Sequence, residues 1–146
     1  YEVATTYGVH KEVLCVGNEQ SLRFAKDVLS EIIELFPSHY IHVGGDECPR
    51  DRWQQCPKCQ ALIHNNGWKD TKEHKAEDKL QSYFMTEVER FVNSKGRQII
   101  GWDEILEGMP MDGSVIMSWR GISGGIEAAR LNHDVMERYG KWYQSG

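Results

Sequence analysis

The sequence contains few of the features that mark specialised classes of protein. Only four of its 146 residues are cysteines, which is too few for a small scaffold held together by disulfides. No apolar run approaches the ~20 residues that a membrane-spanning helix needs. The chain also has no internal repeat, no low-complexity tract and no Asn-x-Ser/Thr glycosylation acceptor. Basic residues (17) are outnumbered by acidic residues (22), and the resulting net charge of −5 argues against a nucleic-acid partner.

The remaining composition is that of an ordinary globular domain. Hydrophobic residues make up 40% of the chain and charged residues 27%. The length predicts a single domain over residues 1–146. No charged and apolar leader begins at Tyr1, so no segment of the sequence indicates a compartment.

The hydrophobic pattern predicts helices that alternate with short strands. Apolar residues at i, i+3, i+4 spacing indicate the helices, and short β-branched runs indicate the strands. In chain order we expect a helix at 21–36 with Ser21 as its N-cap, a strand at 40–43, a helix at 75–95, strands at 98–101 and 114–117, a helix at 124–131 and a strand at 134–136. The polar stretch 46–71 predicts a long loop. This alternation predicts an α/β fold with about four parallel strands covered by helices.

Unusual residues follow three of the expected strands. The first strand is followed by Gly-Gly-Asp-Glu at 44–47, the second by Trp-Asp-Glu at 102–104, and the third by Trp-Arg at 119–120. Because ligands of parallel α/β folds bind outside the carboxyl ends of the strands, we expect these side chains to share one rim. Carboxyl pairs can divide acid and base work, and indole faces can stack on sugar rings. The pattern therefore favours an enzyme that acts on carbohydrates.

The backbone must leave extended geometry after the first strand if both carboxylates are to reach the same ligand. Consecutive residues of a regular strand point to opposite faces, so Asp46 and Glu47 cannot both reach one sugar from an ideal strand. Gly44 and Gly45 allow the required change of direction. We therefore predict that the strand ends at or before Gly45.

Each feature also has a purely structural explanation. The acidic pair after the glycines is compatible with a solvated turn, the two tryptophans with core positions, and a histidine inside an apolar strand with a satisfied core residue. Acidic residues also favour the starts of helical turns. The residues concerned are Asp46, Glu47, Trp102, Trp119, His42, Asp103 and Glu104.

Three motifs in order resemble one known family. The segments at 42–47 (HVGGDE), 100–105 (IGWDEI) and 117–121 (MSWRG) are similar to those of the family 20 glycoside hydrolases, the β-N-acetylhexosaminidases. The segments 6–9 and 14–19 look like that family's approach to its fourth strand. The resemblance covers nearly the whole chain up to Met136.

The resemblance implies a fold and a mechanism. The fold would be part of a (β/α)8 TIM barrel, roughly strands 4 to 7. The reaction would be retaining hydrolysis of terminal β-linked N-acetylglucosamine or N-acetylgalactosamine, in which the substrate's own acetamido group is the nucleophile. Glu47 would be the general acid and base, and Asp46 would hold the acetamido N–H. Trp102 and Trp119 would wall the acetamido pocket, with His42, Asp103 and Glu104 in support.

The resemblance also carries expectations about ligands and location. The partners would be glycans that contain N-acetylhexosamine, and neither a cofactor nor a catalytic metal would be needed. Enzymes of this kind usually work outside the cytosol, in a secreted, periplasmic or lysosomal location. The family's Tyr-x-Asp motif has its nearest match at Tyr139, a candidate for binding substrate, although Lys141 stands where Asp is expected.

The length implies a part of a larger catalytic domain. A complete barrel of this type takes about 250 residues, so the 146 residues would form an incomplete barrel whose activity alone is an open question. The open strand edges of such a piece could pair with a second copy.

The four cysteines leave three alternatives open. Cys56 and Cys59 form a C-x-x-C unit, half of a zinc-binding motif, while Cys15 and Cys48 stand apart from it in the sequence. A zinc site, a disulfide and free thiols are all compatible with this spacing. Two other functions therefore stand beside the hydrolase: a binding module stapled by zinc, and a structural piece without catalytic activity.

Overall fold

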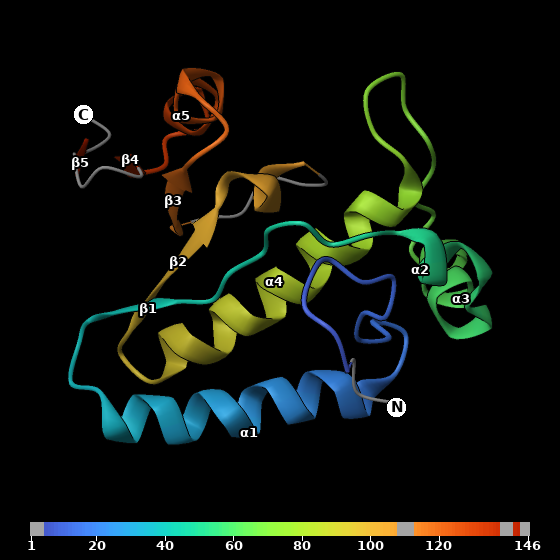
Figure 1. Cartoon of the computed structure of the whole chain (residues 1–146), viewed down its shortest axis with the longest axis horizontal. Helices are drawn as coiled ribbons and strands as arrows, with labels where there is room; N and C mark the ends of the chain where they lie inside the picture. The colour runs from blue at the N-terminus through green and yellow to red at the C-terminus, as the bar shows by residue number, and fades with distance from the viewer. Residues whose placement is uncertain (1–4, 108–112, 138–141, 144–146) are drawn as a thin grey trace.

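Four parallel strands form one sheet in the structure, a computed structural model that describes residues 5–107, 113–137 and 142–143 (Figure 1). The strands lie side by side in chain order, β1-β2-β3-β4, and a short β5 pairs antiparallel with β4. Their bounds are β1 Tyr40–His42, β2 Gln98–Trp102, β3 Val115–Ser118, β4 Val135–Glu137 and β5 Trp142–Tyr143. The four expected parallel strands are confirmed, whereas β5 was not expected.

Helices precede or connect the strands. They are α1 (Glu19–Leu35), α2 (Asp51–Gln55), α3 (Pro57–Asn65), α4 (Ala76–Ser94), a 3-10 turn η1 (Asp103–Leu106) and α5 (Ile122–Arg130). The three predicted helices are therefore confirmed as α1, α4 and α5. The prediction of a long loop at 46–71 was wrong, because two short helices occupy much of this stretch. Pro57 stands at the start of α3, where a missing N–H costs nothing.

The start of α1 also differs from the prediction. Its N-cap is Asn18, whose side chain accepts a hydrogen bond from the Gln20 N–H at 3.2 Å. Ser21, the predicted cap, lies buried within the first turn. Asn and Ser are both good N-caps. Packing, and not local preference, therefore determines that Asn18 and not Ser21 caps α1.

Helices α1 and α4 lie together along one side of the sheet (Figure 1). Helix α4 packs on β2, and α5 packs on β3 and β4. The main core lies between the sheet and these helices, and its buried members are Ile41, Val88, Val92, Ile99, Ile105, Ile116, Ala128 and Val135. Full burial of a valine or isoleucine side chain stabilises a fold by roughly 1.5–3 kcal/mol.

A second apolar cluster joins the N-terminal segment to α2, α3 and α4. Its buried members are Val16, Trp53, Cys59, Ile63, Ala76 and Leu80. The indole N–H of Trp53 donates to the carbonyl of Leu14 at 2.9 Å. This cluster therefore fixes the segment that precedes α1 against the two helices that follow β1. No helix of the described residues is long and apolar enough to cross a membrane.

Candidate active site

The backbone turns sharply directly after β1. The Val43 N–H still donates to Ile100, and the Gly44 carbonyl still accepts from Trp102, each at 2.9 Å. Gly44 then has φ +74° and Gly45 φ +102°. These positive angles are open to glycine without steric cost. The prediction that the strand ends at or before Gly45 is confirmed, since β1 ends at His42.

The turn is also closely packed. A β-carbon added to Gly45 would lie 2.3 Å from Cγ2 of Ile105 and 3.3 Å from Cε of Met85. Glu47, which is not a glycine, has φ +44°. A left-handed backbone is uncommon for such a residue and gathers at functional sites. The sequence therefore places Asp46 and Glu47 on a constrained turn, and both side chains are exposed.

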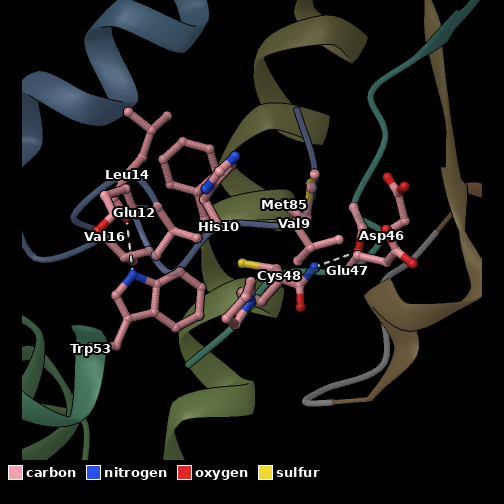
Figure 2. Close-up of a pocket in the computed structure, with 16 residues that line it drawn as sticks. Val9, His10, Glu12, Leu14, Val16, Asp46, Glu47, Cys48, Trp53 and Met85 are labelled. Atoms are coloured by element: carbon pink, nitrogen blue, oxygen red, sulfur yellow. Dashed lines mark hydrogen bonds between the residues drawn. The ribbon is translucent and has the colours of Figure 1, made fainter. Parts of the chain in front are cut away.

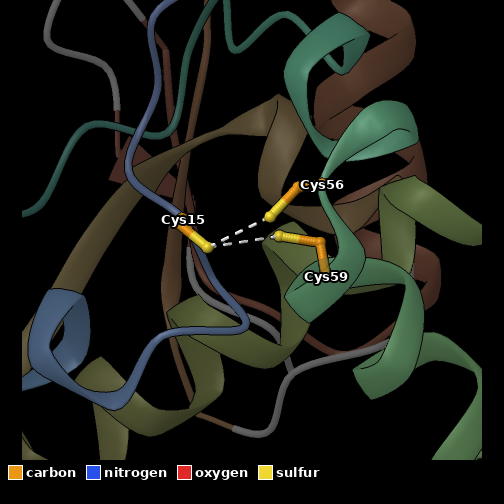
Figure 3. Close-up of side chains that lie close together, drawn as sticks. All are labelled: Cys15, Cys56 and Cys59. Atoms are coloured by element: carbon orange, nitrogen blue, oxygen red, sulfur yellow. Dashed lines mark hydrogen bonds between the residues drawn. The ribbon is translucent and has the colours of Figure 1, made fainter. Parts of the chain in front are cut away.

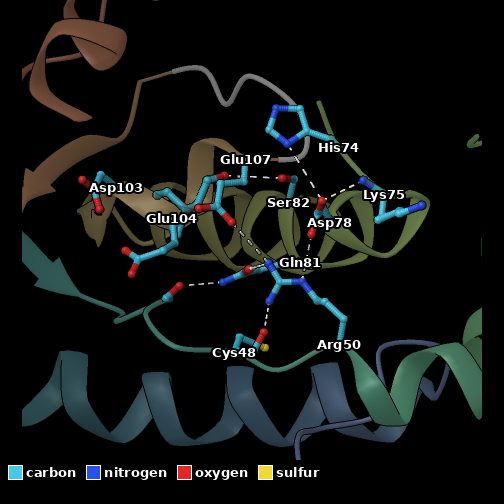
Figure 4. Close-up of polar contacts among 12 residues, drawn as sticks. Cys48, Arg50, His74, Lys75, Asp78, Gln81, Ser82, Asp103, Glu104 and Glu107 are labelled. Carbon is cyan, nitrogen blue, oxygen red and sulfur yellow. Dashed lines mark hydrogen bonds and ion pairs between the residues drawn. The ribbon is translucent and has the colours of Figure 1, made fainter. Parts of the chain in front are cut away.

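Two side chains hold the carbonyls on either side of this acidic pair (Figure 4). The Gln81 amide, from α4, donates to the Gly45 carbonyl at 2.6 Å. The Arg50 guanidinium donates to the Cys48 carbonyl and also to the side chain of Gln81. It further pairs with Asp78 of α4, with Nε 3.2 Å from Oδ1. We call these residues, Arg50, Asp78 and Gln81, the Arg50 clamp.

The clamp was missed at the level of sequence. Arg50 falls in the stretch 46–71, for which the sequence predicts a loop, and Gln81 is a polar residue on an otherwise ordinary amphipathic helix. The one signal in the sequence is that Gln81 lies three and seven positions before Phe84 and Val88, on the predicted apolar face of the helix, where a polar side chain needs partners.

Two cavities meet at the acidic turn. The first cavity has a volume of about 510 Å³. The acidic pair, Asp46 and Glu47, lines it together with residues of the segment from Gly8 to Leu14. Figure 2 shows the acidic pair at one end of this cavity and Trp53 at the opposite end. The second, of about 460 Å³, is lined by Glu47 together with Glu104. Glu47 thus lies between two spaces of the size that holds small ligands.

The aromatic residues of the predicted rim form a cluster of their own. The His42 ring contacts Trp102 edge-on with centroids 4.8 Å apart, and Trp102 contacts Trp119 at 6.4 Å. Among the described residues that line the two cavities, neither indole appears. They are linked to the cavities indirectly, because the Trp119 N–H donates to both carboxylate oxygens of Glu104 at 3.1 and 3.0 Å.

His42 is not the satisfied core histidine considered as an alternative. His42 is exposed, and its Nδ1 accepts a hydrogen bond from the Gly44 N–H at 3.1 Å. Partial desolvation lowers the pKa of His42, and the nearby negative charge of Asp46 opposes that shift. The strand-end histidine therefore lies close to the acidic turn and within reach of its field.

Asp103 and Glu104 are buried, and one cation, Arg120, and neighbouring hydrogen-bond donors hold them. The Arg120 guanidinium lies 3.0 Å from Asp103 and 3.8 Å from Glu104, and it also pairs with Glu107 at 2.6 Å. Burial raises the pKa of Glu104, although the Trp119 N–H and Arg120 favour its charged form. Both acids also begin η1, as acidic residues do at the starts of helical turns.

The predicted site residues therefore divide into groups. Asp46 and Glu47 share a cavity, Trp102 and Trp119 share a contact with each other, and Glu104 joins the two groups. Tyr139 lies outside the described residues.

The cysteines divide as well. The sulfurs of Cys15, Cys56 and Cys59 gather within 4.8 Å of one another, the one group of three or more such ligands found among the described residues. Cys48 is not in this group and lies beside the Arg50 clamp. No disulfide joins any of the four.

Comparison with known proteins decides the family. The sequence profile of "Glycosyl hydrolase family 20, catalytic domain" matches residues 1–143. The chain belongs to glycosyl hydrolase family 20.

Curated relatives of this family 20 chain carry a consistent name. A "Beta-hexosaminidase" of Porphyromonas gingivalis is 48% identical over 130 residues, which cover 89% of this chain and 16% of that protein. A "Beta-hexosaminidase" of Vibrio furnissii is 37% identical and is covered to 19% of its length. The chain thus spans less than a fifth of each of these two relatives.

Solved structures agree with the family assignment. A β-N-acetylhexosaminidase from Bacteroides fragilis matches with a TM-score of 0.76 and 33% identity, over 90% of this chain and 27% of that one. An exo-β-N-acetylglucosaminidase from Vibrio harveyi, solved with N-acetylglucosamine, matches with a TM-score of 0.74 and 32% identity, over 86% of this chain and 19% of that one. The family's catalytic domain is a TIM barrel, and this family 20 chain has the fold of a part of it.

Proposed function

We propose that this family 20 chain carries the acid and base of an enzyme that removes terminal β-linked N-acetylglucosamine or N-acetylgalactosamine from glycans. The observation that carries the proposal is the constrained acidic turn: Asp46 and Glu47 leave the end of a parallel strand side by side and line one cavity. The names of the relatives support the same class of substrate.

In this proposal the substrate supplies its own nucleophile. The acetamido oxygen attacks the anomeric carbon, and the bond to the leaving oxygen breaks as that oxygen takes a proton from Glu47. Water then attacks the bicyclic intermediate, gives its proton back to Glu47 and restores the acetamido group. Two displacements at the same carbon retain the β-configuration, so no second carboxylate is needed as nucleophile.

The neighbouring carboxylate has an electrostatic role in the proposal. Asp46 accepts the acetamido N–H, orients the carbonyl oxygen and stabilises the positive charge that develops on the ring. Its position next to Glu47, on a turn held at both carbonyls by the Arg50 clamp, suits two groups that address one sugar from the same side.

We propose that Trp102 and Trp119 form the apolar wall for the acetamido methyl group. Their edge contact and the bond from Trp119 to Glu104 fix the indole planes. A fixed wall restrains the acetamido group in the conformation from which it attacks. We further propose a location outside the cytosol, where glycans that end in N-acetylhexosamine are exposed.

The test compares two aryl β-glycosides that differ only at C2. The full enzyme in which this chain occurs should hydrolyse the 2-acetamido glucoside and release the β-anomer first, as followed by proton NMR. The matching 2-hydroxyl glucoside, which lacks the internal nucleophile, should be turned over at a negligible rate. Equal rates on the two glycosides, or release of the α-anomer first, would overturn the proposal.

A further inference from the structure

Three cysteine sulfurs from two distant parts of the sequence lie close together (Figure 3). Cys15 lies in the segment before α1, Cys56 lies between α2 and α3, and Cys59 lies in the first turn of α3. The Cys15 sulfur is 3.4 Å from that of Cys56 and 3.7 Å from that of Cys59. This trio is separate from the acidic turn and from the Arg50 clamp.

The spacing of these sulfurs is that of ligands around one metal ion. A tetrahedral zinc site with Zn–S bonds near 2.3 Å holds its sulfurs about 3.8 Å apart, whereas a disulfide brings two sulfurs to about 2.05 Å. The observed 3.4 and 3.7 Å are close to this edge, and all three sulfurs lie within 4.8 Å of one another.

Close packing of the backbone brings Cys15 to the other two. A β-carbon added to Gly17 would lie 2.3 Å from the backbone carbon and oxygen of Lys58 and 2.6 Å from the Cys59 nitrogen. The segment before α1 therefore runs directly against the first turn of α3, which only glycine permits at position 17.

Burial raises the pKa of Cys59 to about 12 and also raises that of Cys15, so a bound cation would have to displace the thiol protons. Cys56 is the N-cap of the nine-residue α3, where the helix dipole favours negative charge. The backbone N–H of Gly17 donates to the Cys59 sulfur, and the N–H groups of Cys59 and Lys58 donate to the Cys56 sulfur. Hydrogen bonds of this kind orient the sulfur ligands of metal sites and stabilise their charge.

We propose that Cys15, Cys56 and Cys59 bind one zinc ion as thiolates, with a water molecule in the fourth position. Binding releases three protons, one from each thiol, so its strength increases with pH. The ion would tie the segment at 5–17, which forms a wall of the cavity beside Glu47, to α2 and α3. Its role is to hold that wall, and it takes part in no step of the hydrolysis.

Metal analysis of the enzyme tests this without any measurement of activity. We expect one zinc ion per chain after purification without chelators. Replacement by Co²⁺ should give the intense near-ultraviolet bands of cobalt–thiolate charge transfer. The variants Cys15→Ser and Cys59→Ser should bind zinc at least about 100-fold more weakly, since even the loss of a supporting contact costs 10–100-fold. Cys48→Ser is the matched control and should keep the ion, because Cys48 lies outside the trio.

Three results would overturn the proposal. Mass spectrometry that finds two hydrogens fewer than the reduced chain, in a disulfide among the trio, would assign these cysteines to a covalent staple. Four thiols that react in the native enzyme, with no bound zinc, would make them ordinary thiols. Zinc that remains in both Cys15→Ser and Cys59→Ser would place the ion elsewhere. If a serine variant fails to fold, the cobalt spectrum of the unaltered enzyme still decides, because without thiolate ligands the charge-transfer bands are absent.

Discussion

Replacing Arg50 by Met should both destabilise the enzyme and slow its reaction. The guanidinium of Arg50 bonds Asp78, Gln81 and the Cys48 carbonyl, and it lies 5.4 Å from the centre of the Trp53 ring. Methionine keeps much of the apolar stem but removes every donor. Asp78 then loses its cation, and the Cys48 carbonyl loses its partner.

The size of the effect follows from how little water reaches this pair. The side chains of Arg50 and Asp78 are 17% and 18% exposed. Breaking a fully buried pair by removing one partner costs about 3–5 kcal/mol, and losing an exposed pair costs about 0–1 kcal/mol. We expect a loss of about 2–3 kcal/mol in the free energy of unfolding, nearer the buried limit.

Arg52 provides a matched control two residues away. It pairs with Glu12 at 2.6 Å, but the two side chains are 60% and 51% exposed. Arg52→Met should therefore cost less than about 1 kcal/mol. Urea unfolding of both variants measures the difference. If the two substitutions change the unfolding free energy equally, the Arg50 clamp is not a structural unit.

The kinetic consequence separates positioning from stability alone. Because the Arg50 clamp holds the carbonyls on both sides of the acidic pair, its loss should lower kcat by up to about 100-fold, the cost of misplacing reacting groups by about 1 Å. KM should change much less, and Arg52→Met should leave both constants near their original values. A folded Arg50→Met enzyme with unaltered kcat would refute the positioning role.

Two further predictions concern the surroundings of the acidic turn. Gly45→Ala should lower kcat and stability together, because the new methyl group meets Ile105 at 2.3 Å and the backbone angle of +102° is strained for alanine; Gly67→Ala is a control with positive φ but open space, and equal losses in the two would contradict the steric argument. Glu104→Gln should gain stability relative to the original enzyme as the pH rises. Burial raises the folded pKa of Glu104 above its ordinary value of 4.5, so the stability that its protonated form contributes is complete below that value and is lost as the pH rises through the folded pKa. Urea unfolding at several pH values above 4.5 measures the difference in unfolding free energy between the variant and the original enzyme. If this difference decreases as the pH rises, the pKa of Glu104 is not raised in the folded enzyme.

The strands and long helices could be predicted from periodicity because they bury continuous apolar faces. Ile41, Ile99 and Ile116 lie in short runs whose pattern alone indicates buried strands. Helices α2 and α3 could not be predicted in this way, since five and nine residues carry little periodicity and Pro57 resembles a breaker. Tertiary contacts through Trp53 and Ile63 stabilise them instead.

The acidic turn could be predicted in outline, since paired glycines before Asp46 and Glu47 indicate a departure from strand geometry. The Arg50 clamp could not, because the contact between Arg50 and Gln81 spans 31 positions and depends on how α4 packs. The convergence of Cys15 with Cys56 and Cys59 is equally non-local, across 41 and 44 positions. Sequence spacing indicated a C-x-x-C unit, and only the fold selected its third member.

The most direct test of the account is the rate of Glu47→Gln on aryl 2-acetamido-β-glucosides whose leaving groups differ in basicity. A glutamine cannot donate a proton as a carboxylic acid does. The variant should therefore lose about 10²- to 10⁴-fold in rate on glycosides with basic leaving groups, while activated nitrophenyl glycosides, which leave without protonation, should lose far less. Circular dichroism should show an unaltered fold. A folded Glu47→Gln enzyme that hydrolyses both kinds of glycoside at the original rates would contradict the assignment of Glu47 as the general acid.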